Sequence, residues 1–276
     1  MQKIKNKFSV IMPVYFQECP NQLRAAIESI VNQTLIPNEI IIVLDGPVGE
    51  NLHEVIDEFK TCNLIKVIKL DTNSGVGVAR KKAIEIAHYD ILALMDSDDI
   101  SCKDRFEKQI SKILSQEANV VGGWIEEFDK EPHDTGIIRK SPVTHDEIYK
   151  YGKWRMPVNN VTLMFTREVY NDVGGYSDQS KSEDWNLIVR FLANGVKFYN
   201  FPEILVNVRA GQDMFLRRRG WTQVFSQLYI FPLMYKLKYI GLFHLIANVS
   251  IRLLLRLMPI SLTSYLYRNF LRQKIS

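Results

Sequence analysis

The stretch "ILALMDSDDI", residues 91–100, decides both the fold and the chemistry that this chain can support. Its first five residues are apolar, which predicts a buried strand. Three carboxylates follow within four positions, at Asp96, Asp98 and Asp99. Carboxylates this close together repel one another, so the end of the strand needs a compensating positive charge.

The sequence around this stretch alternates between strand and helix patterns. Runs of β-branched and apolar residues predict strands at 8–14, 39–44, 64–70, 90–95 and 119–124. Between them, apolar residues spaced three or four apart predict amphipathic helices that contain Leu23, Leu52, Ala79 and Phe106. Strands that alternate with helices predict an α/β fold with a mostly parallel sheet covered on both faces.

Each of the first four predicted strands runs into a cluster of candidate site residues. The clusters are "PVY" (13–15), "LDGP" (44–47), "DTNSGVGVAR" (71–80) and "DSDD" (96–99). Ligands of such sheets bind at the carboxyl ends of the strands. We therefore expect one site on this rim.

A second half follows without a clean linker. Residues 161–165 predict a strand, followed by a helix that ends at Gly174 and by an exposed aromatic turn in "GGYSD" (174–178). The segment "SEDWNLIVRFLANG" (182–195) predicts a helix that stops at Gly195. Glu183 and Asp184 then lie at its N-terminus, where the helix dipole favours negative charge.

The acidic turn at 96–99 has two interpretations. Hard carboxylate oxygens suit Mg²⁺ or Mn²⁺, and such ions commonly bridge to substrate phosphates. Alternatively, the turn is solvated, and Asp99 or Ser101 caps the next helix. An Asp-x-Asp pair is common by chance, so its place directly after a buried strand is what favours the metal.

Two other clusters have equally plain interpretations. Asp45, Gly46 and Pro47 make good turn chemistry without any ligand. The glycines after Asn73 fit a simple turn into a helix. They also fit a helix N-terminus that binds phosphate, with Arg80 one turn inside.

Taken in order, the motifs resemble the family 2 glycosyltransferases of the GT-A fold. The resemblance rests on "SVIMPVYF", "LDGP", "LDTNSGVGVARKKAI", "LMDSDD", "GGYSD" and "SEDWNLIVR", and it covers roughly residues 8–210. It points to bacterial enzymes of capsule, exopolysaccharide and O-antigen assembly, including the amylovoran and colanic acid type. It implies a Rossmann-like, mostly parallel sheet, with a nucleotide-sugar-binding half at 1–125 and an acceptor half at 126–208.

The resemblance also implies roles for the donor-side residues. Those that would contact the nucleotide sugar are Pro13, Val14, Tyr15, Asp45, Asn73, Gly75, Arg80, Asp96 and Ser97. Pro13 to Tyr15 would wall the base, and Asp45 would hydrogen-bond the uracil of a UDP-sugar. Asp96 would contact the ribose or sugar, while Asp98 would hold Mg²⁺ or Mn²⁺ on the diphosphate.

On the acceptor side, the resemblance makes Asp184 the catalytic base and Glu183 its neighbour. Further candidates for contacts with the acceptor or its phosphates are Asn160, Trp185, Arg209, Arg217 and Arg218. Two positions depart from the family pattern, because Gly46 stands where a second acid is usual and Asn160 where close relatives commonly carry histidine. The implied reaction is an inverting displacement in which a carboxylate removes the acceptor proton.

Two other functions fit parts of the sequence. A sugar-nucleotide nucleotidyltransferase needs a loop rich in glycine and basic residues after the first strand, and "PVYFQECPNQ" (13–22) has neither. A non-catalytic, nucleotide-binding membrane scaffold would not need the carboxylates Asp96, Asp98 and Asp184 to be intact. Both therefore stand behind the transferase.

Charge divides the chain near residue 208. Residues 209–276 hold 11 of the 35 Lys and Arg but one of the 31 Asp and Glu, which gives this tail +10 and residues 1–208 −6. A basic, hydrophobic tail suggests contact with an anionic surface. The arginines and aromatics of "FLRRRGW" (215–221) are also typical of single-strand binders, but the neighbouring segments are too apolar, and we expect no nucleic acid partner.

The tail contains "YIGLFHLIANVSIRLLLRLM" (239–258), which is just long enough to span a bilayer, although its two arginines make spanning costly. His244, Asn248, Arg252 and Arg256 recur every four residues, opposite leucines and isoleucines. This pattern predicts a helix that lies in the membrane interface, and it would also fit a helix packed on the protein's own core.

No signal peptide is indicated, because the first apolar run is short and interrupted by Pro13. We expect a monotopic protein on the cytoplasmic face of the bacterial inner membrane. Its partners would be a UDP-sugar donor, a lipid-linked saccharide acceptor and an anionic membrane surface, with room for other polysaccharide-assembly enzymes.

Overall fold

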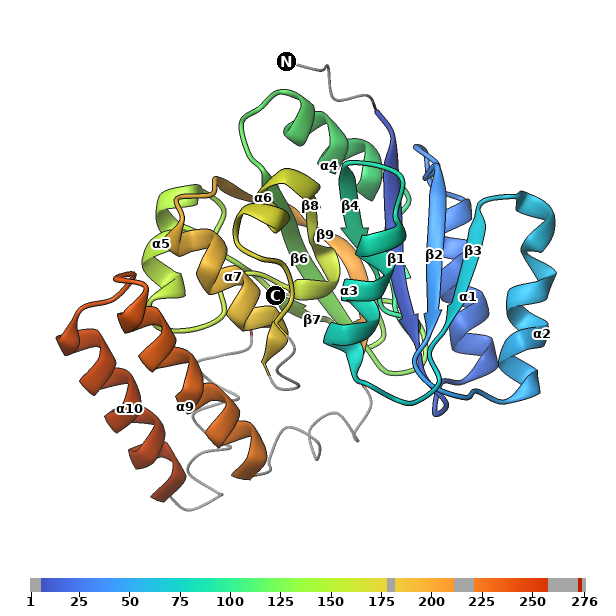
Figure 1. Cartoon of the computed structure of the whole chain (residues 1–276). Coiled ribbons are helices and arrows are strands. Elements are labelled where there is room, and N and C mark those ends of the chain that lie inside the picture. The colour runs from blue at the N-terminus through green and yellow to red at the C-terminus, as the bar shows by residue number, and fades with distance from the viewer. Residues whose placement is uncertain (1–5, 178–181, 211–220, 258–272, 275–276) are drawn as a thin grey trace.

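The computed structural model describes residues 6–177, 182–210, 221–257 and 273–274 (Figure 1). Its centre is one sheet with the strand order β10-β7-β6-β8-β4-β1-β2-β3, and β9 pairs with both β6 and β5. The strands are β1 (Phe8–Val14), β2 (Glu39–Leu44), β3 (Ile65–Lys69), β4 (Ile91–Leu94), β5 (Ile100–Ser101), β6 (Val120–Phe128), β7 (Ile137–Arg139), β8 (Met164–Thr166), β9 (Phe198–Arg209) and β10 (Gln273–Lys274).

Helices follow most of these strands. They are α1 (Pro20–Val31), α2 (Glu50–Glu58), η1 (Lys60–Cys62), α3 (Val76–Ile86), α4 (Arg105–Leu114), α5 (His145–Gly152), η2 (Asn160–Thr162), α6 (Arg167–Asp172), α7 (Glu183–Ala193), α9 (Trp221–Lys236) and α10 (Leu242–Leu257). The predicted alternation of strand and helix over the first 125 residues is confirmed. Within the described ranges, every helix is too short or too polar to cross a bilayer.

The first four strands make a parallel sheet in the spatial order β4-β1-β2-β3. Their carboxyl ends therefore meet at one rim, as the sequence predicted. β8 then pairs antiparallel with β4 and with β6, while β9 runs parallel to β6. Residues 126–208 thus continue the same sheet and do not form a separate one.

Apolar residues fill both faces of the sheet. Alternate residues of β1 divide between them: Val10, Met12 and Val14 join a cluster with α1, α2 and α4. Ile11 lies on the other face, with α3, α6, α7 and α9. Because successive side chains of a strand point to opposite faces, the unbroken apolar run of β1 marks a strand that is buried on both sides.

The predicted strand at 161–165 is wrong in its first half. Residues Asn160–Thr162 form the 3₁₀ turn η2, and only β8 is extended. The side chain of Thr162 stabilises this turn, because Oγ1 donates to the carbonyl of Asn159 (2.7 Å) and accepts from the amide of Gly123 (3.0 Å). The turn brings Asn160 to the carboxyl rim.

The exposed aromatic turn predicted at 174–178 is also wrong, since Tyr176 is 1% exposed. The hydroxyl of Tyr170 accepts a hydrogen bond from the Tyr176 amide (3.0 Å), and the two rings pack edge to face. Gly175 makes room for this packing. Its φ is +64°, and a Cβ at this position would lie 2.7 Å from the Tyr170 ring.

The tail packs on the body through α9. Ile230, Phe231 and Met234 are fully buried in the cluster that also holds α7. Figure 1 shows α9 and α10 side by side at the lower left, next to α7. β9 ends at Arg209, one residue beyond the expected boundary, and the division of the chain into two domains there stays a prediction.

We expect Gly175→Ala to lower the free energy of unfolding by about 2–4 kcal/mol, because the new methyl group meets both a left-handed backbone and the Tyr170 ring. Gly195→Ala is the matched control. Gly195 also has a positive φ, +71°, but open space around it, so strain alone should cost about 1–2 kcal/mol. Urea denaturation of both variants measures the difference, and equal losses would show that Tyr170 moves aside without cost.

Candidate active site

The clusters at the carboxyl rim open into one cavity of about 730 Å³, a size typical of small-molecule sites. Thirteen of the predicted site residues line it: Pro13, Val14, Tyr15, Asp45, Asn73, Gly75, Arg80, Asp96, Ser97, Asp98, Asn160, Glu183 and Asp184. They come from the end of β1, from the loops after the four parallel strands, from α3, from η2 and from the start of α7. The cavity therefore lies between the two halves of the sheet.

Of the other four predicted residues, Trp185 and Arg209 do not line the cavity, and two are not described by the structure. Trp185 does not line the cavity; it is buried behind the wall, with its ring edge-on to Phe231 of α9. The expected direct contact of Trp185 with the acceptor is therefore wrong, because its side chain points from α7 into the hydrophobic core. Arg217 and Arg218 lie outside the described residues.

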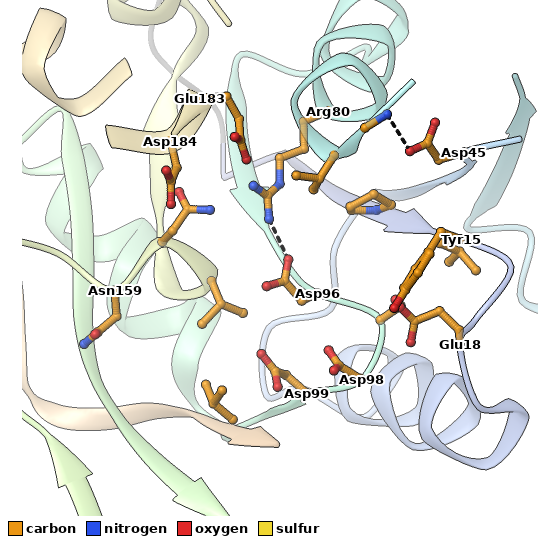
Figure 2. Close-up of a pocket in the computed structure, with 18 of the residues that line it drawn as sticks. Tyr15, Glu18, Asp45, Arg80, Asp96, Asp98, Asp99, Asn159, Glu183 and Asp184 are labelled. Carbon is orange, nitrogen blue, oxygen red and sulfur yellow. Dashed lines mark hydrogen bonds and ion pairs between the residues drawn. The ribbon is translucent and has the colours of Figure 1, made fainter. Parts of the chain in front are cut away.

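Arg80 lies between the acidic turn after β4 and the start of α7. Its Nη2 lies 2.6 Å from Asp96 Oδ1, and its side chain is 4% exposed. Figure 2 shows the guanidinium between Asp96 and Glu183. Burial lowers the pKa of Arg80, but the charge of Asp96, with smaller contributions from Glu183 and Asp184, raises it above its ordinary value. Arg80 is therefore a permanent cation among the carboxylates.

Asp45 stabilises the loop that leads into α3. Oδ1 accepts from the amide of Ser74 (2.7 Å) and Oδ2 from the amide of Gly75 (2.9 Å). The carboxylate of Asp45 therefore binds backbone amides, as it would in a turn. The amides belong to a loop about 30 residues later in the chain, and not to the turn at 45–47. Asp45 is 4% exposed and still lines the cavity.

Gly46 departs from the family pattern for a steric reason. Its φ is +87°, and a Cβ there would lie 2.6 Å from the backbone nitrogen of Asn73. An acidic side chain could not fit without displacing the 72–75 loop. The loss of the usual second acid is therefore linked to the close contact between this turn and the loop before α3.

Arg209 supports the acidic turn and is not part of the cavity wall. Its amide donates to Asp99 Oδ1 (2.8 Å) and its Nε to the carbonyl of Asp98 (3.3 Å), while its guanidinium lies over the ring of Phe128. The expected contact of Arg209 with acceptor phosphate is therefore corrected, because the end of β9 uses this residue to hold the turn. Burial raises the pKa of Asp99 well above its usual range, and the charges of Asp98 and Asp96 raise it further.

Arg105 is a cation that sequence reasoning missed. It is 0% exposed, and its Nη2 donates to the carbonyls of Leu94 (2.7 Å) and Val161 (3.0 Å). The first carbonyl ends β4 and the second lies within η2, so one guanidinium links the acidic turn after β4 to η2. Burial lowers the pKa of Arg105 to about 9, and the nearby charges of Asp96 and Asp99 oppose that shift. The one signal in the sequence was that Arg105 lies four residues before Gln109. In the structure, Arg105 Nε donates to Gln109 Oε1 (2.9 Å).

The cavity wall carries more negative than positive charge. Among its described residues, seven bear carboxylates (Glu18, Asp45, Asp96, Asp98, Asp99, Glu183 and Asp184) and two bear guanidinium groups (Arg80 and Arg139). Arg80 is paired with Asp96, so a divalent cation at Asp98 fits the charge and the hard oxygen donors of the turn. In the described part of the chain, no three Asp, Glu, His or Cys side chains form a metal cluster by themselves. Magnesium commonly takes one or two carboxylates and completes its shell with water and substrate phosphates.

Glu183 and Asp184 occupy the first turn of α7, as predicted. Asp184 Oδ1 accepts from the Trp185 amide (2.7 Å), which fixes one of its oxygens. Glu183 packs on the first turn of α3, where a Cβ on Gly77 would lie 2.8 Å from its Cγ. Burial raises the pKa of Glu183, and the charge of Asp184 raises it further.

Several residues of the wall that follow β5 in the chain carried no motif that would have identified them. They are Ile125, Arg139, Met156, Val158, Asn159 and Val208. Asn159 is 3% exposed, and its Nδ2 donates to the carbonyl of Gly123 (2.9 Å) and to Ser141 Oγ (2.9 Å). It therefore orients η2, on which Asn160 faces the cavity. The adjacent pair of asparagines was the only available signal.

The order of these elements agrees with a known protein family. The profile described as "Glycosyl transferase family 2" matches residues 9–174. An uncharacterized glycosyltransferase of Haemophilus influenzae is 38% identical over 268 residues, 97% of this chain and 100% of the relative. The chain belongs to glycosyl transferase family 2.

Two further relatives of this glycosyltransferase have more specific descriptions. The amylovoran biosynthesis glycosyltransferase AmsE of Erwinia amylovora is 33% identical over 263 residues, 95% of this chain and 98% of the relative. A UDP-Gal:alpha-D-GlcNAc-diphosphoundecaprenol beta-1,3-galactosyltransferase of Escherichia coli is 34% identical over 268 residues, 97% of each. The family predicted from the motif order is confirmed.

Solved structures of S. aureus TarS share the architecture. The complex of TarS 1–349 with UDP-GlcNAc gives a TM-score of 0.66 at 17% identity, over 90% of this chain and 71% of that one. The structure of TarS 1–349 alone also gives 0.66, over 96% of this chain and 75% of that one. At such identity the likeness establishes the fold, and the predicted GT-A architecture is confirmed.

We expect Glu183→Gln to raise the melting temperature at neutral pH. Because burial and Asp184 raise the pKa of Glu183 in the folded protein, its ionised form opposes folding. That penalty is complete above the raised pKa and vanishes below the ordinary value of 4.5, where the carboxyl is protonated in both states. Scanning fluorimetry should therefore show a gain at pH 8 that shrinks toward pH 4.

Glu168→Gln is the control, because it removes an exposed carboxyl from the first turn of α6. It should show no such divergence between the two pH values. A gain for Glu183→Gln that is the same at both would mean that the charge of Glu183 is not what opposes folding.

Proposed function

We propose that this glycosyltransferase moves a sugar from a UDP-sugar to a hydroxyl of a saccharide acceptor, with inversion at the anomeric carbon. The observation that carries the proposal is the cavity itself. It brings the acidic turn after β4 within the same wall as the carboxylate pair that starts α7. A donor bound at the first and an acceptor held at the second would meet between them.

The donor would lie along the rim formed by the first four strands. Pro13, Val14 and Tyr15 are available to wall the base. Each oxygen of Asp45 accepts one backbone N–H. A carboxylate offers about four acceptor sites, which leaves capacity for the N–H of uracil. Asn73 and Gly75, at the start of α3, would follow the nucleoside and diphosphate, where backbone N–H groups favour anions.

Asp98 would hold Mg²⁺ or Mn²⁺, with Asp96 beside it toward the ribose or sugar. When bound, the ion would supply positive charge against the charge that develops on the departing diphosphate. Arg80 keeps Asp96 in place through their 2.6 Å ion pair. Arg105 and Arg209, which lie outside the cavity wall, hold the two ends of the turn by donating hydrogen bonds to the carbonyls of Leu94 and Asp98.

Asp184 would act as the general base. Its carboxylate takes the proton of the acceptor hydroxyl as that oxygen forms a bond to the anomeric carbon. The bond from this carbon to the diphosphate oxygen breaks, and its electron pair leaves with the nucleotide. The hydrogen bond from the Trp185 amide to Oδ1 orients the carboxylate. Glu183 is the acceptor-side neighbour and the second candidate for the base.

We propose a polyprenyl-diphosphate-linked saccharide as the acceptor. Its support is the E. coli relative, whose description names a GlcNAc-diphosphoundecaprenol acceptor. Asn160 and Arg139 line the acceptor side of the cavity and offer an amide and a guanidinium to such a molecule. A lipid-linked acceptor implies work at a membrane surface, which we propose to be the cytoplasmic face of the inner membrane. Surface polysaccharide assembly would be the pathway class.

Asp184→Asn should leave UDP affinity intact and lower turnover by roughly a hundredfold or more, because the amide cannot accept the acceptor proton. The measurement is UDP release from a panel of UDP-sugars with Mn²⁺ and acceptor. Asp172→Asn, an exposed acid at the end of α6, is the control and should turn over like the wild type. Wild-type turnover of Asp184→Asn at saturating acceptor would make Glu183 the next candidate. Absence of UDP release with every donor would refute the proposed function.

Asp98→Ala and chelation by EDTA should each weaken UDP binding by about tenfold or more, since both leave the diphosphate facing carboxylates without a cation. Titration calorimetry with and without Mn²⁺ measures the effect. Asp104→Ala is the matched control, because this acid pairs with Lys108 and lies outside the cavity wall. Unchanged UDP affinity in both the chelated wild type and Asp98→Ala would remove the metal from the proposal.

A further inference from the structure

Helix α10 exposes a row of large apolar side chains on one side. Leu242, Phe243, Ile246, Ile251 and Leu254, the outer face of α10, are between 44% and 74% exposed. At 100° per residue they span half of the helix circumference. A helix that served only to cover the core would bury this side.

The polar stripe of α10 packs on the body together with Leu245 and Val249. Asn248 is 1% exposed, and its Nδ2 donates to the carbonyl of Lys153 (3.0 Å). Arg252 Nη2 donates to the carbonyl of Trp154 (3.0 Å), and the His244 ring lies 5.0 Å from the Trp154 ring. The sequence allowed a helix in the membrane interface or a helix packed on the core. Neither alternative specified which side of α10 faces the body. The hydrogen bonds to the chain after α5 fix it.

Arg252 links this helix to the catalytic one. Its guanidinium lies 4.3 Å from the centre of the Phe231 ring of α9 and 5.7 Å from that of Trp185. Trp185 directly follows Asp184 and donates its amide to that carboxylate. α10 is therefore fastened to the acceptor side of the cavity with its apolar side outward.

The charge of the segment indicates what covers the outer face. Residues 214–276 contain no Asp or Glu, and the tail from 209 carries +10. At the turn between α9 and α10, Lys236 and Lys238 are exposed beside the exposed ring of Tyr235. Aromatic and basic residues around an apolar face are typical of helices in the interface of anionic membranes. A second copy would bring another +10 tail to the same place, which charge repulsion opposes.

We propose that the outer face of α10 docks on an anionic lipid bilayer, with the helix lying along the surface. The 16 residues of α10 span about 24 Å, less than the hydrocarbon thickness, which agrees with a surface position. The docking takes its purpose from the proposed lipid-linked acceptor, but its physical basis is independent of the reaction. It sets the acceptor side of the cavity, through Arg252 and Trp185, next to the bilayer.

The test uses the full-length protein and a triple variant, Phe243→Asn, Ile246→Asn and Leu254→Asn. The three side chains are 57–74% exposed, so the variant should fold. Flotation at low salt uses vesicles of phosphatidylglycerol with phosphatidylcholine, and vesicles of phosphatidylcholine alone. The wild type should float with the anionic vesicles, and the triple variant should lose about tenfold or more of its bound fraction. Ile36→Asn is the control. It removes an apolar side chain that is 51% exposed and lies far from α10 in the sequence, and this variant should float like the wild type.

Point variants are preferable to deletion of residues 221–276, which would uncover the core residues that pack against Ile230, Phe231 and Met234. Calorimetric UDP affinity equal to that of the wild type verifies that the triple variant is folded. Equal flotation of wild type and triple variant overturns the proposal. A wild-type dimer that ignores vesicles and becomes monomeric in the triple variant also overturns it, in favour of a second copy.

The outcome is separable from the proposed reaction. UDP release with a water-soluble acceptor saccharide is measured for both proteins without vesicles. Loss of flotation with normal release supports the docking surface. Absence of release in both proteins, with flotation lost only in the variant, rejects the reaction and leaves the docking surface standing.

Discussion

The acidic turn at residues 96–99 is the constraint on which the rest of the site depends. Three carboxylates at the end of a buried strand would repel one another and destabilise the fold without compensation. The fold surrounds them with three arginines from three elements: Arg80 of α3, Arg105 of α4 and Arg209 of β9. Only Arg80 pairs with one of these carboxylates from within the cavity wall. The other two act from outside the cavity wall, and Asp98 itself lines the cavity.

The same arginines connect the two halves of the protein. Arg105 bridges the carbonyls of Leu94 and Val161, and Arg80 lies between Asp96 and the start of α7. A buried guanidinium that loses its partners leaves an uncompensated charge and unpaired carbonyls, both of which are costly. The relative position of the turn after β4, η2 and the start of α7 is therefore tied to the stability of the core. This is how a family 2 glycosyltransferase can hold a preorganised cavity between distant segments.

Much of the cavity wall at the ends of the first four strands could be predicted because its signals are local. Asp45, Asn73, Gly75 and Asp96 each follow a strand whose apolar run is visible in the sequence, and parallel strands end on one rim. The carboxylate pair at 183–184 was equally visible as the start of a helix. Arg105, Asn159 and Arg139 were not, because a buried arginine and a surface arginine look alike until the chain around them is folded. Trp185 and Arg209 were misplaced for the same reason, since the chain direction after a motif decides whether a side chain faces ligand or core.

The sequence by itself determined the order of strands and helices, the rim on which the site lies, and the excess of acid that calls for a cation. It could do so because strand and helix periods and the ends of parallel strands are local properties of the chain. Only the tertiary structure decided that Tyr176 is buried, that Gly46 must lack a side chain and that α10 turns Leu242, Phe243 and Leu254 outward. Each of these depends on a contact with residues far away in the chain: the ring of Tyr170 allowed by a left-handed glycine, the backbone of Asn73, and the carbonyls of Lys153 and Trp154. An amphipathic pattern shows that a helix has two sides, and it is the hydrogen bonds available on the body that select which side faces inward.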